Sequence, residues 1–95
     1  APKFPAVTRD IALQVADTVT NAEVMQIFQQ HGGAYLKDVT LFDVYAGSHM
    51  APGQKSLAYT LTYRRDDQTL TEEEVTQAFD RVKAALESDL GATIR

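Results

Sequence analysis

The chain of 95 residues is 44% hydrophobic and 23% charged, ordinary values for one globular domain, spanning residues 1–95, with a single modest core. It contains no cysteine, and its two histidines, His31 and His49, lack the spacing of metal ligands, so disulfides, a cysteine nucleophile and a metal site are not expected. The net charge of −4 disfavours strong electrostatic binding to a polyanion. Because the chain has no apolar run of about 20 residues and no signal pattern, we expect a soluble, intracellular protein with no membrane partner.

The first sixteen residues divide into a lead-in and a strand. Residues 1–8 contain two prolines and no clear period, which predicts an extended lead-in, and we interpret it as a linker from a longer chain. Residues 9–16 then alternate, which predicts a half-buried strand. Its apolar side holds Ile11, Leu13 and Val15, and its other side holds Asp10, Ala12 and Gln14.

A helix is predicted over residues 21–31. Thr20 and Glu23 have the spacing of a capping box, in which each side chain bonds the backbone N–H of the other residue. Val24, Ile27 and Phe28 then mark one helical face, and two glycines end the helix at residues 32–33.

Two long strands are predicted next, over residues 34–46 and 54–65, joined by a loop over residues 46–53. In the first of them, Phe42 and Val44 share one side, and Asp43 and Tyr45 share the other. The side of Asp43 and Tyr45 also receives Val39 and Leu41, which indicates a β-bulge or something that covers that end.

The second helix is predicted over residues 71–89, again after a capping box, formed by Thr71 and Glu74, and Gly91 ends it before a short last strand at residues 92–95. The order β-α-β-β-α-β, with right-handed crossovers and adjacent parallel central strands, indicates an α+β fold. We expect a ferredoxin-like sandwich, with a four-stranded antiparallel sheet and two helices on one of its faces.

The helices would leave the other face of the sheet uncovered. The packed face would collect Ile11, Leu13, Val15, Phe42, Val44, Leu57, Tyr59, Leu61 and Tyr63. The open face would hold Asp10, Ala12, Gln14, Asp43, Tyr45, Ser56, Ala58, Thr60 and Thr62. With Tyr45 opposite Ser56 and Asp43 opposite Ala58, this face presents an aromatic ring beside hydrogen-bonding groups. An aromatic ring with hydrogen-bonding groups beside it can hold an unpaired nucleobase.

The predicted charge distribution allows only weak binding of RNA. The two predicted helices carry a net charge of −5 and the remainder of the chain +1. We therefore expect a roughly neutral sheet, which can touch RNA without holding it electrostatically.

Several motifs in order give the chain a resemblance to a known family. They are Phe4-Pro5, Arg9-Asp10-Ile11, residues 41–47 (Leu-Phe-Asp-Val-Tyr-Ala-Gly), residues 53–58 (Gly-Gln-Lys-Ser-Leu-Ala), Arg64 and Thr69-Leu70-Thr71. With these spacings the chain resembles, over nearly its whole length, the ferredoxin-fold anticodon-binding domain. That domain ends the beta subunit of bacterial phenylalanyl-tRNA synthetase.

The resemblance implies a module that holds the anticodon stem-loop of phenylalanine tRNA and has no catalytic residue of its own. It implies that Tyr45 stacks on the first anticodon base, a guanine, and that Asp43 and Ser56 supply polar contacts beside Ala58. It further implies a cytoplasmic parent enzyme of two alpha and two beta subunits that uses ATP and Mg²⁺, neither of which would bind to this domain. Lys55 and Arg64 are candidates for phosphate contacts, or they keep an edge of the sheet soluble.

Two other classes of function remain open. Acyl-phosphate hydrolases also use a ferredoxin-like fold, but they need a glycine-rich anion cradle and an Asn that positions water. Residues 17–20 (Asp-Thr-Val-Thr) contain no glycine, and the only asparagine, Asn21, lies at the start of the helix. A regulatory or protein-interaction module that uses the same sheet is the third possibility.

Overall fold

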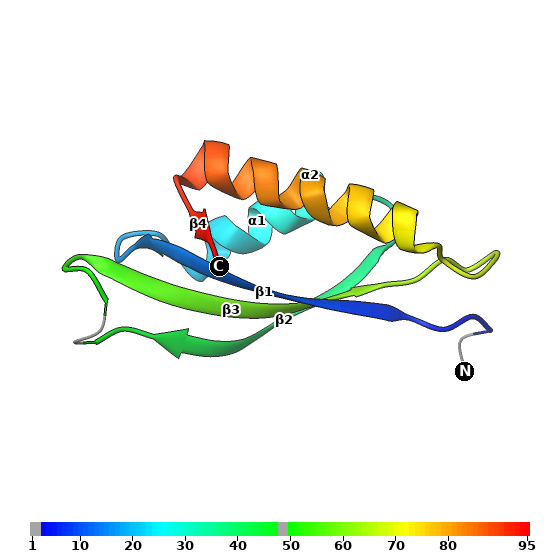
Figure 1. Cartoon of the computed structure of the whole chain (residues 1–95), viewed down its shortest axis with the longest axis horizontal. Coiled ribbons are helices and arrows are strands. Elements are labelled where there is room, and N and C mark those ends of the chain that lie inside the picture. Colours follow the sequence, from blue (N-terminus) through cyan, green and yellow to red (C-terminus); the bar gives the residue numbers. More distant parts are fainter. Residues whose placement is uncertain (1–2, 48–49) are drawn as a thin grey trace.

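The computed structural model describes residues 3–47 and 50–95. His49 and the first two residues of the predicted lead-in lie outside these ranges. The chain forms, in order, β1 (Val7–Ala16), α1 (Asn21–His31), β2 (Leu36–Tyr45), β3 (Gln54–Tyr63), α2 (Glu72–Leu90) and β4 (Thr93–Ile94). Both helices lie on the same side of the sheet (Figure 1), as the sequence predicts. The lead-in is shorter than predicted, because Val7 and Thr8 already pair with β3.

The strand order is β2-β3-β1-β4, and every neighbouring pair is antiparallel. This confirms the predicted ferredoxin-like arrangement with its antiparallel sheet. The expectation that the central strands β1 and β3 run parallel is wrong. The α1 crossover makes β2 parallel to β1, and the hairpin then inserts β3 between them in the opposite direction.

Capping boxes set the start of both helices. The Thr20 hydroxyl accepts a hydrogen bond from the backbone N–H of Glu23, and the Glu23 carboxylate accepts one from the backbone N–H of Thr20. Thr71 and Glu74 repeat this exchange at α2. At the other end of α2, Gly91 takes a left-handed conformation with φ of 64°, which a residue with a Cβ adopts less readily. Local sequence therefore defines where each helix begins and ends.

The core lies between the helices and the inner face of β1 and β3. The rings of Phe28 and Tyr59 meet edge to face, with centroids 5.1 Å apart. The buried hydrophobic residues are Ile11, Leu13, Val15, Val24, Ile27, Phe28, Leu57, Tyr59, Leu61, Tyr63, Leu70, Val75, Ala78, Val82, Ala85, Leu86 and Ala92. Seven of the nine residues predicted for the packed face belong to this core.

Phe42 and Val44, the other two, are exposed by 54% and 56%. The predicted burial of these two side chains is wrong, and the reason is tertiary. A β-bulge shifts the register between Leu41 and Asp43, which confirms the irregularity indicated by the sequence. Beyond the bulge, the end of β2 extends past α1 at the edge of the sheet (Figure 1), so no helix covers it.

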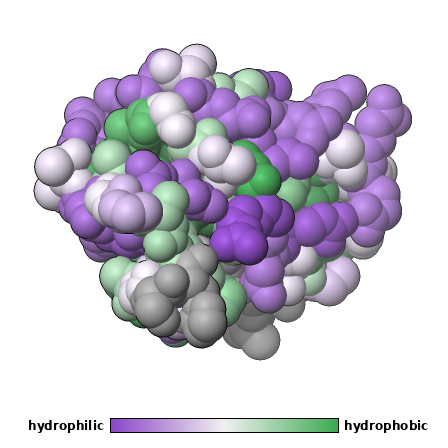
Figure 2. Space-filling model, turned by 60° about the vertical axis from the view of Figure 1, so that its left-hand side comes forward, coloured by the Kyte–Doolittle hydropathy of each residue, from purple (hydrophilic) through white to green (hydrophobic). Residues whose placement is uncertain are grey.

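The surface near this end of the molecule is mainly hydrophilic, and its hydrophobic patches are small and separated (Figure 2). Within residues 3–47 and 50–95, no helix is long and apolar enough to cross a membrane. The same part of the chain contains no cluster of three or more His, Cys, Asp or Glu residues suited to a metal ion.

Candidate nucleic-acid interface

The β2–β3 hairpin brings four of the predicted RNA-binding residues together. Tyr45 lies opposite Ser56, and Asp43 lies opposite Ala58. Residues that face each other across two strands share one side of a sheet. Since the intervening Leu57 is buried beneath the helices, this group of four points to the other side. We call this helix-free side the open face.

The polar groups of this cluster are available to a ligand. The Tyr45 side chain is 44% exposed. Within the described ranges, no hydrogen bond engages the Tyr45 hydroxyl, the Asp43 carboxylate or the Ser56 hydroxyl. A Cβ placed on Gly47 would lie 3.9 Å from the Tyr45 Oη, so the loop backbone passes beside the phenol. The hydroxyl end of the ring therefore lies beside the loop, while much of Tyr45 stays exposed to solvent.

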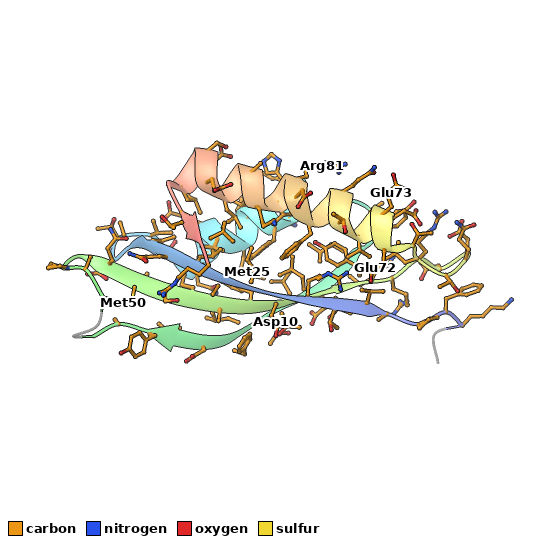
Figure 3. The ribbon with its side chains drawn as sticks, viewed as in Figure 1. Asp10, Met25, Met50, Glu72, Glu73 and Arg81 are labelled. Carbon is orange, nitrogen blue, oxygen red and sulfur yellow. The ribbon has the colours of Figure 1, made fainter. Side chains whose placement is uncertain are left out.

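The open face continues from the hairpin onto β1 and β4. Ser56 is flanked by Gln14 on β1, and Gln14 by Thr93 on β4. Ala58 is flanked in the same way by Ala12. The next position pairs Asp10 with Thr60, whose hydroxyl donates to the Asp10 carboxylate at 2.8 Å. Figure 3 shows Asp10 on the side of the sheet away from the helices. The short side chains in the middle make a flat surface.

Lys55 and Arg64 do not lie with this cluster. Lys55 is opposite Val15 on β1, so it belongs to the side that faces the helices. There its charge adds a small contribution to the lowered pKa of Glu23, which is due mainly to the hydrogen bonds from Thr20. Arg64 follows the far end of β3, roughly 26 Å of strand from Ser56, and pairs with Asp66 at 3.6 Å. Phosphate contacts by these two residues stay predictions.

The electrostatic character of the open face differs from the neutral sheet expected from counting charges. Asp10, Asp38 and Asp43 all lie on it, since their partners across the strands are Thr60, Thr62 and Ala58. Nearby cations are engaged elsewhere. Arg9 pairs with Glu72 at 2.6 Å, on the helix side, and Lys37 pairs with Asp66 at 3.3 Å. The face is therefore acidic.

Sequence reasoning missed several residues of the open face, among them Asp38, Thr93 and one cation, Arg95. The backbone N–H of Arg95 donates to the Ala12 carbonyl at 2.9 Å, which extends the β1–β4 pairing by one residue beyond Ile94. Arg95 thus lies opposite Ala12 and shares its side of the sheet. The signal was present in the predicted last strand, but that strand had no register until its partner was known.

The structure also weakens the hydrolase alternative. The backbone N–H of Asp17, in the turn where an anion cradle would be needed, donates to the Gly53 carbonyl at 2.9 Å. The Asn21 side-chain oxygen accepts the hydroxyl of Tyr59 at 2.8 Å. The Asp17 N–H and the Asn21 side-chain oxygen are thus already used within the fold.

Comparison with known proteins places the chain in a family. The sequence model of the ferredoxin-fold anticodon binding domain matches residues 2–95. The chain belongs to this family. Among curated relatives, the chain is 58% identical over 95 residues to the phenylalanine–tRNA ligase beta subunit of Latilactobacillus sakei. It is 51% identical over 94 residues to that of Bacillus subtilis.

These matches cover all or nearly all of this anticodon-binding domain but little of the relatives. They include 100% and 99% of the chain, and 12% of each of the two beta subunits. The resemblance and the fold expected from the sequence are both confirmed. The open face, with Tyr45, Asp43, Ser56 and Ala58 on it, is the candidate surface for anticodon binding.

Proposed function

We propose that this chain is the tRNA-binding module of a phenylalanine–tRNA ligase beta subunit and holds the anticodon stem-loop of phenylalanine tRNA. The observation that carries the proposal is the placement of Tyr45, Asp43 and Ser56 on one uncovered face in a chain of the anticodon-binding family. Residues 1–95 would form one domain of a longer cytoplasmic chain. The ligase chemistry, which uses ATP and Mg²⁺, and the alpha subunit of the two-alpha, two-beta enzyme would belong to other parts of that assembly.

Tyr45 supplies affinity. Its ring is 44% exposed at the edge of a flat surface, where the face of an unpaired base can lie against it. Stacking of a base on an aromatic ring contributes roughly 1–3 kcal/mol and does not depend on the identity of the base. Tyr45 therefore holds a base without selecting it.

Asp43 supplies selectivity. An ionised carboxylate only accepts hydrogen bonds, and guanine presents two adjacent donors, its N1–H and its exocyclic N2 amine. Asp43 is two residues from Tyr45 on the same face, so its oxygens lie beside a base stacked on that ring. Ser56, directly opposite Tyr45, adds a hydroxyl that both donates and accepts. This arrangement favours guanine as the stacked base.

Replacing Tyr45 with Ala tests the binding surface. We expect Tyr45→Ala to weaken binding of the phenylalanine anticodon stem-loop by roughly 5- to 150-fold, the equivalent of one lost stack, in a titration followed by nuclear magnetic resonance. Val44→Ala is the matched control, because Val44 is 56% exposed on the same strand but lies opposite Leu57, on the other side. Equal affinity of both variants and the wild type would exclude this role of Tyr45. A melting shift with amino acids and none with RNA would support the regulatory alternative.

Replacing the guanine tests the role of Asp43. Inosine lacks the N2 amine, so a stem-loop with inosine at the first anticodon position should bind the wild-type chain less tightly. In Asp43→Ala the difference between guanine and inosine should shrink, because no side-chain oxygen remains to accept from N2. A bidentate contact of this kind discriminates by about 1–3 kcal/mol, which is measurable in the same titration. An unchanged guanine-to-inosine ratio in Asp43→Ala would contradict the assignment.

A further inference from the structure

The open face lacks positive charge where the proposed function needs it. An RNA strand that places a base on Tyr45 brings its phosphates over a surface that carries Asp10, Asp38 and Asp43. Carboxylates repel phosphates, and binding to a polyanion requires cations that displace its counterions. A phosphate contact close to the Tyr45 cluster would offset this repulsion.

None of the basic residues in and just after β3 reaches the central part of this face. Lys55 faces the helices. Arg65 is held by Asp67 and Glu74, with its Nη1 atom 2.6 Å from the Glu74 carboxylate. Arg64 lies at the far end of β3 and pairs with Asp66. Each is turned away from the Tyr45 cluster or distant from it.

Arg95 has the required position. Its backbone hydrogen bond to Ala12 places it on the open face, in line with Ala12, Ala58 and Asp43 across the four strands. The side chain is exposed, and no carboxylate within the described residues forms a salt bridge with it. Three strand spacings of about 4.8 Å separate it from β2, roughly 14 Å in all.

We propose that Arg95 binds a backbone phosphate of the RNA whose base stacks on Tyr45, so that the bound strand crosses the sheet from β2 toward β4. This inference rests on the proposed function, and it adds the direction of the bound RNA strand and an electrostatic contact. The guanidinium group matches a phosphate with two parallel hydrogen bonds. Between the two ends, Ala58 and Ala12 leave the path flat, and Ser56 and Gln14 border it with polar groups.

The test compares two arginines on opposite sides of the molecule. Arg81 is exposed on α2, on the helical side (Figure 3), and also forms no salt bridge within the described residues. Affinity for the stem-loop is measured over a salt series for the wild type, Arg95→Ala and Arg81→Ala. Arg95→Ala should bind more weakly and reduce the slope of log affinity against log salt by about 0.7, the value for one phosphate contact on a single strand. Arg81→Ala should leave both unchanged.

Two further measurements separate a phosphate contact from other causes. Arg95→Lys keeps the charge and should retain most of the wild-type slope. The guanine-to-inosine ratio should be the same in Arg95→Ala and the wild type, because a phosphate contact does not read the base. Salt slopes that are equal in Arg95→Ala and Arg81→Ala would overturn this inference. If Tyr45→Ala still weakened binding, the proposed function would stand, whereas loss of that effect would end the proposed function itself.

Discussion

Tyr59 and Tyr63 are the two largest fully buried side chains, yet their hydroxyl groups have different environments. The Tyr59 hydroxyl donates to Asn21 at the start of α1, at 2.8 Å. The Tyr63 hydroxyl is buried without a hydrogen-bond partner among the described residues. Burial raises the pKa of each phenol to about 12, so both stay protonated at neutral pH. A buried hydroxyl without a partner has lost its hydration with no replacement.

Replacing each tyrosine with Phe should therefore have opposite effects. Tyr63→Phe removes an unsatisfied group and should leave the free energy of unfolding unchanged or raise it by about 1 kcal/mol. Tyr59→Phe removes a formed hydrogen bond and should lower it by about 1 kcal/mol. Urea unfolding of the two variants measures both effects. If Tyr63→Phe were as destabilising as Tyr59→Phe, the Tyr63 hydroxyl would have a bonding partner such as a bound water.

At the start of α2, a residue of the helix cap also takes part in a contact between separate segments of the chain. Glu74 completes the capping box with Thr71 and also accepts a hydrogen bond from Arg65 at 2.6 Å. Arg65 in turn donates twice to Asp67 and lies over the ring of Tyr35, 4.9 Å from its centroid. One guanidinium thus connects the end of β3, the turn after it and the first turn of α2.

These contacts make the stability of the element depend on pH. The Thr71 backbone N–H, and after it the Arg65 guanidinium, hold the pKa of Glu74 below its ordinary value. The hydrogen bonds from Arg65 lower the pKa of Asp67. A carboxyl whose pKa is lower in the folded state stabilises the fold above its unfolded-state pKa and loses that contribution as the pH falls through the folded-state pKa. The stabilisation is therefore present at neutral pH and lost in acid.

Glu74→Gln isolates this effect. Gln is also accepted at this position of a capping box, so the variant keeps the cap but removes the titrating charge. We expect it to be less stable than the wild type at neutral pH, and to lose less stability as the pH falls below the ordinary carboxyl range. Glu73→Gln, at an exposed neighbour (Figure 3), should retain the wild-type slope. Unfolding by urea at a series of pH values provides the comparison, and identical slopes for both variants would contradict it.

At the scale of the whole molecule, acidic groups lie on two separate surfaces. The helices α1 and α2, which lie on one side of the sheet (Figure 1), carry seven acidic residues. The open face, on the other side, presents three aspartates of its own. Helical charge is separated from the open face by the thickness of the core, a distance over which salt screens strongly. RNA binding would then depend on the few groups of the open face. Affinity should be modest, since stacking and hydrogen bonds act against a local negative potential.

Prediction from sequence succeeded where the signal was local. The helix bounds agree within about one residue because a capping box and a terminal glycine lie next to the residues they define. The pairing of Tyr45 with Ser56 and Asp43 with Ala58 was also found, because a hairpin fixes its register through its own connecting loop. The exposure of Phe42 and Val44 was not predicted, because it depends on how far α1 extends over the sheet.

The candidate site likewise has a part that local sequence predicted and a part that it did not. Strand alternation alone put a phenol, a carboxylate and a hydroxyl on one side of the hairpin, because the pleat turns every second side chain the same way. Alternation also turns Lys55, the neighbour of Ser56, toward the helices. Only the assembled sheet brought Arg95 into line with Ala12, since that depends on how β1 pairs with a strand distant in sequence. Neighbouring residues determine short-range geometry, whereas the charge of a face is determined only when separate strands pair in register.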